Sequence, residues 1–90
     1  MLGRLDMDSV TATVKEKLRH ILGLRDPLTA DLELETVGLS SLTVIQLLAE
    51  LEDAFDLIFE GRELRFENFA TVRLIADTVA LKLSAAHGAH

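Results

Sequence analysis

Two adjacent serines, Ser40 and Ser41, are the strongest candidates for chemistry in this sequence because they stand at a junction between a loop and a helix. They follow Gly38 and Leu39, and an amphipathic run begins directly after them. A hydroxyl at such a junction lies beside free backbone N–H groups and the positive end of the helix dipole. Together these favour a phosphate ester by about 0.3–1 kcal/mol. The arrangement therefore indicates a serine that becomes modified.

Neither serine has the neighbours that a nucleophilic catalyst needs. A serine nucleophile requires a base, but His20 lies in a predicted helix and His87 and His90 lie in the C-terminal tail. The sharp Gly-x-Ser-x-Gly turn of many hydrolases is also absent. The chain contains no cysteine, which excludes a thiol nucleophile, a zinc thiolate site and a disulfide framework. The missing base makes a catalytic serine a poorer fit than a modified one, and a chain of 90 residues has too thin a core for a deep substrate pocket, which favours an interaction module over an enzyme.

Acidic residues dominate the middle of the chain. Residues 31–60 contain no Lys or Arg and eight acids, namely Asp31, Glu33, Glu35, Glu50, Glu52, Asp53, Asp56 and Glu60. We expect a partner that meets this stretch to be basic there; the alternative is that the acids only keep the region soluble. An EF-hand starting at Asp31 is disfavoured, because Thr36 and Leu42 stand where that loop needs Gly and Glu.

The composition predicts one small domain. The chain has 90 residues, 15 acids against 9 bases, a net charge of −6 and an apolar fraction of 49%, which is typical of a folded protein with a thin core. An acidic chain has few Lys and Arg side chains with which to neutralise the phosphates of a nucleic acid. No apolar run approaches the ~20 residues of a membrane span. We expect a cytoplasmic protein with no nucleic-acid or membrane partner, ordered over about residues 8–84, with a frayed tail at residues 85–90.

Hydrophobic periodicity predicts a helix near each end of the chain and no convincing strand. The first spans about Ser9–Leu22, is capped by Asp8 or Ser9 and ends at Gly23. The last begins after Thr71 and ends at Ser84. The apolar faces comprise Val10, Val14, Leu18, Ile21 and Leu22 in the first helix, and Val72, Ile75, Val79 and Leu83 in the last.

Two long connections carry apolar residues that must reach the core. Residues 24–39 are long for a helix connection, so the leucines within them require this loop to lie across the core. For residues 56–70 we expect a loop with one short helical turn. The aromatic side chains of this loop are expected to fill the core. The apolar residues concerned are Leu28, Leu32, Leu34 and Val37 in the first connection, and Phe59, Phe66 and Phe69 in the second.

The helix predicted over about Ser41–Phe55, with Ser40 as its N-cap, carries two apolar rows. One row consists of Val44, Leu47, Leu48, Leu51 and Phe55, and the other of Leu42, Ile45 and Ala49, continuing into Glu52 and Asp53. Two rows need two surfaces to cover them. Either the helix is buried nearly all round, or one row faces the core and the other a partner.

Four short motifs in order resemble those of the acyl carrier proteins. They are Gly38-Leu39-Ser40-Ser41-Leu42, Val44-Ile45-Gln46-Leu47-Leu48, Leu51-Glu52-Asp53-Ala54-Phe55-Asp56 and Phe69-Ala70-Thr71-Val72. Each motif is weak alone, but their order and spacing are specific, and the resemblance covers about residues 10–83. It implies an all-α fold, a four-helix bundle with a long first loop and a short third helix.

The resemblance also implies a cofactor and partners. It places 4′-phosphopantetheine on Ser41, because Leu42 directly follows the modified serine in the family; the group comes from coenzyme A through a phosphopantetheinyl transferase. The terminal thiol of this arm holds a thioester, so a chain without cysteine can still handle thiol chemistry. Carriers dock through their second helix. The expected docking surface therefore consists of Ser40, Leu42, Ile45, Ala49, Glu52 and Asp53.

Several positions depart from the better-known carriers. Ser40 replaces the usual Asp, Thr43 and Gln46 stand where fatty acid carriers often have acids, and Arg62 and Arg65 bring positive charge to the third-helix region. Carriers of nonribosomal peptide synthesis usually have a Gly-Gly pair, whereas Val37 precedes Gly38 here. The chain looks most similar to small free-standing bacterial carriers that are aminoacylated.

That similarity implies a loading partner and a cargo. Such carriers are loaded by amino acid:carrier protein ligases that resemble class II aminoacyl-tRNA synthetases, and the cargo is a small amino acid such as glycine or alanine. A downstream enzyme then accepts the group. Two alternatives stay open, namely a carrier for specialised polyketide or fatty-acid-type biosynthesis, loaded by an acyl-loading enzyme, and an unmodified helical interaction module whose second apolar row forms a dimer seam.

Overall fold

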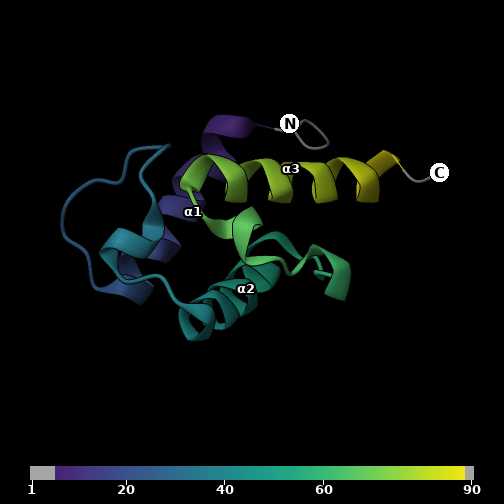
Figure 1. The fold of residues 1–90 in the computed structure, drawn as a ribbon. Helices are drawn as coiled ribbons and strands as arrows, with labels where there is room; N and C mark the ends of the chain where they lie inside the picture. The colour runs from purple at the N-terminus through teal and green to yellow at the C-terminus, as the bar shows by residue number, and fades with distance from the viewer. Residues whose placement is uncertain (1–5, 89–90) are drawn as a thin grey trace.

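Three long helices and three short 3₁₀ helices make up the fold. The computed structural model describes residues 6–88, and within that range it contains no strand (Figure 1). In chain order the elements are α1 (Met7–Leu22), η1 (Leu34–Val37), α2 (Ser41–Phe55), η2 (Gly61–Glu63), η3 (Phe66–Phe69) and α3 (Val72–Gly88). The all-α prediction is confirmed. The expected short third helix takes the form of two 3₁₀ turns, η2 and η3, rather than one α-helix.

Side-chain caps fix where α1 and α2 begin. Helix α1 starts at Met7, because Asp6 Oδ1 accepts hydrogen bonds from the backbone N–H groups of Asp8 (3.1 Å) and Ser9 (3.4 Å). The prediction of a cap at Asp8 or Ser9 is therefore wrong, since Asp6 has the same capping chemistry and Asp8 lies in the first turn. The end at Gly23, which has a left-handed φ of 68°, and the bounds of α2 are confirmed.

Helix α3 begins as predicted and ends later than predicted. The Leu74 N–H donates to Thr71 Oγ1 at 3.2 Å, which caps the first turn. The helix then runs to Gly88, so the expectation of fraying from residue 85 is wrong through residue 88. Nothing between Ser84 and Gly88 breaks a helix, and the two alanines there favour one. The rest of the expected tail, residues 89–90, lies outside the described residues.

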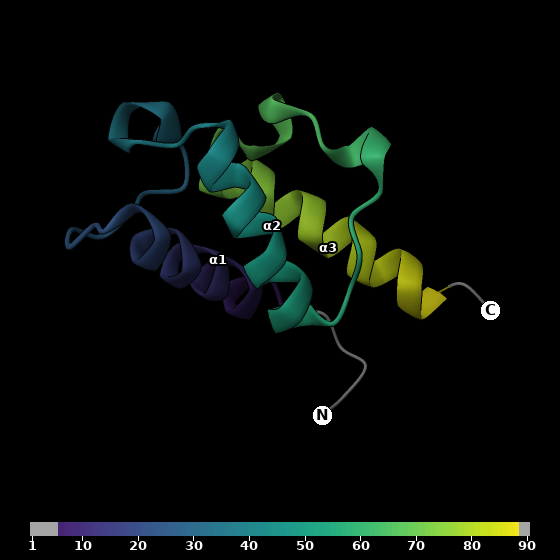
Figure 2. The ribbon, with the colours of Figure 1, turned by 90° about the horizontal axis from the view of Figure 1, so that it is seen from below.

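The core lies where α1 packs against both α2 and α3 (Figure 2). Both predicted loop contributions are confirmed, since Leu28 and Leu34 from the first connection and Phe59 and Phe69 from the second are buried. Burial of each such side chain contributes about 1.5–3 kcal/mol. The helices bury Val10, Val14, Leu18, Val44, Leu47, Leu51, Val72, Ile75, Ala76 and Val79.

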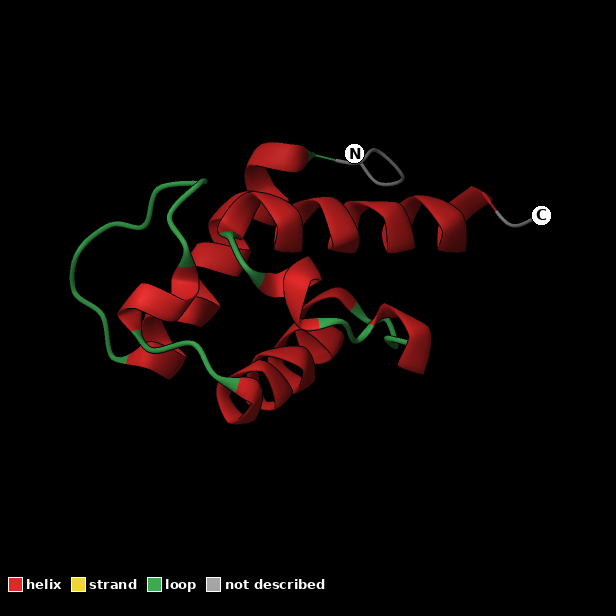
Figure 3. Cartoon of the chain, viewed as in Figure 1, coloured by secondary structure: helices red, strands yellow, loops and turns green. Residues whose placement is uncertain are grey.

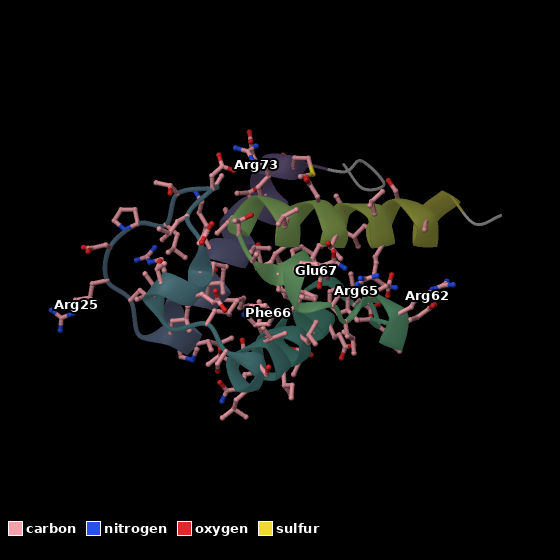
Figure 4. The ribbon with its side chains drawn as sticks, viewed as in Figure 1. Arg25, Arg62, Arg65, Phe66, Glu67 and Arg73 are labelled. Atoms are coloured by element: carbon pink, nitrogen blue, oxygen red, sulfur yellow. The ribbon has the colours of Figure 1, made fainter. Side chains whose placement is uncertain are left out.

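The long loop between α1 and η1 is fastened to the start of α3 (Figure 3). The Leu34 N–H donates to the Ala70 carbonyl at 2.9 Å, and the Arg73 N–H donates to the Ala30 carbonyl at 3.0 Å. The Arg73 side chain, at the beginning of α3 in Figure 4, donates to both carboxylate oxygens of Asp31, at 2.7 and 3.0 Å. These hydrogen bonds hold the pKa of Asp31 below its ordinary value. The loop therefore delivers the chain to α2 from a fixed position.

The second connection is fastened to α3 by a partly buried ion pair. Lys82 Nζ donates to Glu63 Oε1 at 2.8 Å and to Oε2 at 3.1 Å, and it lies 5.9 Å from the centre of the Phe59 ring. That ring packs edge-on against Phe69 at 6.1 Å. Partial burial raises the pKa of Glu63, but the hydrogen bonds from Lys82 and from the Glu60 N–H outweigh it and hold the pKa below its ordinary value of 4.5.

Replacement of Lys82 by Met should test how much this ion pair stabilises the fold. Methionine keeps a long apolar side chain at this position, while Glu63 loses its partner, so we expect the free energy of unfolding at pH 7 to fall by about 1–2 kcal/mol. Because the folded-state pKa of Glu63 is lowered, the stabilisation is present above pH 4.5 and fades as the pH falls further. Urea unfolding at pH 7 and pH 3.5 should show a difference between variant and wild type that shrinks in acid.

Arg62→Met provides the matched control. Arg62 pairs with Glu60 at 3.1 Å, but both side chains are largely exposed, so its loss should change stability by less than about 0.5 kcal/mol. Equal losses for Arg62→Met and Lys82→Met would show that the burial of the Lys82 pair contributes nothing.

Candidate functional site

Ser41 is the first residue of α2, and its side chain is exposed. Among the described residues its hydroxyl makes no hydrogen bond, and it stands where the first backbone N–H groups of the helix point outward. The α2 dipole places its positive end at this position. A phosphate attached to the hydroxyl would lie next to those donors, so the geometry fits a phosphodiester.

Ser40 differs from Ser41 because both its side chain and its backbone are engaged in capping. The Ser40 N–H donates to Thr43 Oγ1 at 2.7 Å, and the Thr43 N–H donates to Ser40 Oγ at 3.4 Å. Thr43 Oγ1 also donates to the Ser40 carbonyl at 3.0 Å. This reciprocal capping box confirms Ser40 as the N-cap. Thr43 occupies the position where this motif usually has Glu or Gln, so its part in the cap was not predicted from the sequence.

Gly38 turns the chain from η1 into α2. Its φ of 111° is accessible to glycine and strained for residues with a side chain, and its N–H donates to the Glu35 carbonyl at 3.3 Å. A Cβ at this position would lie 3.9 Å from Leu22 Cδ2, so the backbone angle rather than space selects glycine. Beside it, the Leu39 N–H donates to the Leu34 carbonyl at 3.0 Å. The junction before Ser41 is thus held by its own backbone.

The two apolar rows of α2 have different surroundings. Val44, Leu47 and Leu51 are buried, whereas Leu42 is 69% exposed, Ile45 is 63% exposed and Ala49 is exposed. Of the two interpretations drawn from the sequence, burial nearly all round is therefore wrong. Leu48 and Phe55, also assigned to the buried row, are half-buried and pack against the core.

Glu52 and Asp53, expected together on the docking surface, differ in what they contact. The Phe59 N–H donates to Glu52 Oε2 at 2.9 Å, and the Leu57 N–H donates to the Glu52 carbonyl at 3.2 Å. Glu52 therefore holds the chain after α2, where Asp56 takes a left-handed φ of 54°. Asp53 is exposed and takes part in no ion pair among residues 6–88. The hydrogen bond that Glu52 accepts was not predictable from local sequence patterns, because its donor, the Phe59 N–H, lies in an irregular loop.

Within the described residues, no group of three His, Cys, Asp or Glu side chains is arranged to hold a metal ion, and this includes Asp31, Glu33 and Glu35. None of the helices between residues 6 and 88 is both long and apolar enough to cross a membrane.

The comparisons with known proteins agree with this geometry. Residues 12–79 match the family described as a phosphopantetheine attachment site. A protein named aminoacyl carrier protein, from Agrobacterium fabrum strain C58, is 35% identical over 77 residues, which cover 82% of this chain and 93% of that relative. The chain belongs to the acyl carrier-like proteins that bear a phosphopantetheine attachment site, and it is therefore a non-catalytic carrier that serves partner enzymes.

Proposed function

We propose that Ser41 is the residue that bears 4′-phosphopantetheine, transferred from coenzyme A by a phosphopantetheinyl transferase. The observation that carries this assignment is the contrast between the two serines, since Ser40 Oγ caps α2 while the hydroxyl of Ser41 is exposed and unbonded among the described residues. The attached group supplies a thiol on which a carboxylic acid is held as a thioester. The chain itself holds the attachment point rigid and presents it to enzymes.

The proposed cargo is a small aminoacyl group of the glycyl or alanyl type, loaded by an amino acid:carrier protein ligase and passed to an acceptor enzyme. Two observations support it. The relative from Agrobacterium fabrum is named an aminoacyl carrier protein, and Ser40, Thr43 and Gln46 replace acids that are common in carriers of fatty acid synthesis.

The proposed docking surface consists of the N-cap Ser40 and of Leu42, Ile45, Ala49, Glu52 and Asp53 on α2, of which all but the half-buried Glu52 are exposed. Its apolar part is supported by the exposure of Leu42 and Ile45, 69% and 63%, on a helix whose other face is buried. The acidic character of this surface is supported by Asp53, whose carboxylate has no ion-pair partner among residues 6–88. A partner with apolar and basic side chains complements such a surface.

Single substitutions of the two serines test the attachment site. After incubation with coenzyme A and a broad-specificity phosphopantetheinyl transferase, intact mass should show one added phosphopantetheinyl group on wild type and on Ser40→Ala. Ser41→Ala should stay unmodified and keep its fold. Because Ser40 caps α2, Ser40→Ala should cost about 1 kcal/mol of stability. Modification of Ser41→Ala but not of Ser40→Ala would move the site by one residue.

Loading of the modified protein tests the cargo. The holo protein is incubated with ATP, a ligase of the proposed type and either glycine, alanine or a bulkier amino acid, and intact mass is measured. We expect glycine or alanine to be attached, and the attached group to be released by hydroxylamine, as a thioester is. Loading by a fatty acyl or malonyl transferase but by no aminoacyl ligase would favour the specialised acyl carrier instead.

Charge reversal on α2 tests the docking surface. Asp53→Lys should raise the KM of the loading enzyme for the carrier several-fold, and more so at low salt, because the carboxylate is exposed to the partner's field. Asp77→Lys, an equal charge change on an exposed position of α3, is the control and should leave the KM unchanged. Equal effects of both variants would show that only net charge matters. Glu52 is unsuited to this test, since its carboxylate also holds the Phe59 N–H.

A further inference from the structure

A cavity of about 240 Å³ lies between η1, η3 and the start of α3. Its lining consists of Glu33, Glu35, Phe66, Ala70, Thr71 and Leu74. Figure 4 shows Phe66 in the middle of the fold, away from Arg62 and Arg25, which extend from opposite ends of the molecule. The cavity thus combines two carboxylates with an aromatic ring and aliphatic side chains.

The carboxylates of this cavity have no cationic partner. Neither Glu33 nor Glu35 takes part in a salt bridge or a side-chain hydrogen bond between residues 6 and 88. No Lys or Arg lines the cavity, and Arg73, which is next to Leu74 in sequence, is engaged by Asp31 at 2.7 Å. A small cation with an apolar side chain complements this lining, because carboxylates bind ammonium groups and an aromatic ring attracts them.

The cavity also lies within a limited distance of Ser41. Glu35 is six residues before Ser41, and an extended chain of that length spans at most about 20 Å. The actual separation is shorter, because residues up to Val37 form a 3₁₀ helix with a rise of about 2 Å per residue. The intervening backbone is held by the hydrogen bonds of Gly38 and Leu39. A long flexible arm on Ser41 therefore starts close to this cavity.

We propose that this cavity receives the aminoacyl group carried on Ser41, with Glu33 and Glu35 pairing with its α-ammonium and Phe66 and Leu74 contacting its side chain. The inference rests on the proposed function. In it, the two carboxylates of the cavity distinguish an aminoacyl cargo, which has an α-ammonium group, from an acyl cargo, which has none. Paired carboxylates favour the protonated amine. A protonated amine has no lone pair with which to attack a thioester, so the cavity protects the cargo in transit.

A comparison of alanyl and propionyl cargo isolates the ammonium group. A broad-specificity phosphopantetheinyl transferase can transfer the alanyl-phosphopantetheinyl group from alanyl-coenzyme A, and the propionyl-phosphopantetheinyl group from propionyl-coenzyme A. Neither reaction needs a ligase. We expect the alanyl form, relative to the propionyl form, to shift the amide NMR signals of residues 33–35, 66 and 74. Equal spectra of the two forms, or shifts confined to α2, would overturn the proposal.

The pKa of the α-amine gives a second measurement. With ¹⁵N-alanine as cargo, the amine pKa on the wild type should exceed that of free alanyl-pantetheine by at least about half a unit. The double variant Glu33→Gln/Glu35→Gln should lose this increase, while Glu16→Gln/Asp26→Asn, an equal charge change at exposed positions elsewhere, should keep it. Equal pKa values in both variants would contradict the assignment.

The failure of this inference and that of the proposed function give different results. If neither acyl-coenzyme A adds mass at Ser41, the proposed attachment to Ser41 is wrong and the cavity proposal falls with it. If Ser41 is loaded and a ligase attaches alanine, but the alanyl and propionyl forms have equal spectra, only the cavity proposal is wrong.

Discussion

The arrangement of the site depends on how the N-terminus of α2 is capped. The first N–H groups of any helix need acceptors; here the Ser40 hydroxyl accepts from the Thr43 N–H, and Thr43 Oγ1 accepts from the Ser40 N–H in return. The cap thus engages the Ser40 hydroxyl, whereas the Ser41 hydroxyl makes no hydrogen bond between residues 6 and 88 and is exposed. Gly38, with its left-handed φ, and the Leu39 N–H set the direction from which the chain reaches the cap. The two serines, adjacent and chemically identical, thereby have different surroundings, which is the contrast on which the proposed attachment to Ser41 rests.

Helix α2 is shared between the core and the surface, and each side constrains the other. The exposure of Leu42 and Ile45 forgoes the burial energy of two large apolar side chains, about 1.5–3 kcal/mol each. The opposite row anchors the helix through Val44, Leu47 and Leu51. Glu52 adds a further attachment, because its carboxylate holds the Phe59 N–H seven residues away. The exposed row therefore lies on a helix that is anchored along its opposite face, as the proposed docking surface requires.

Much of this fold is predictable from the sequence because helical periodicity and helix caps are local signals. The bounds of α2, the buried faces of all three helices and Thr71 as a cap follow from them. The turns η1, η2 and η3 do not, since they depend on tertiary contacts such as the bond from Leu34 N–H to the Ala70 carbonyl. Asp6 and Asp8 have the same capping chemistry, so the sequence alone does not decide between them, and the structure places the cap at Asp6. In the site, motif spacing indicates the serines, while the hydrogen bond that Glu52 accepts from the Phe59 N–H depends on the geometry of the loop after α2.

The acidic stretch of residues 31–60 is a composite of carboxylates with different tasks. Asp31 pairs with Arg73 and Glu50 with Lys17, which connects elements that are distant in sequence, and Glu52 holds the loop directly after α2 through the Phe59 N–H. Glu33, Glu35 and Asp53 have no such partner between residues 6 and 88. Solubility alone does not account for either group of acids. Asp31, Glu50 and Glu52 make contacts within the fold, and Glu33, Glu35 and Asp53 lie before and after Ser41 in the sequence. Negative charge that the fold does not neutralise is thus left before and after the proposed attachment point, where a cationic cargo and a basic partner would meet it.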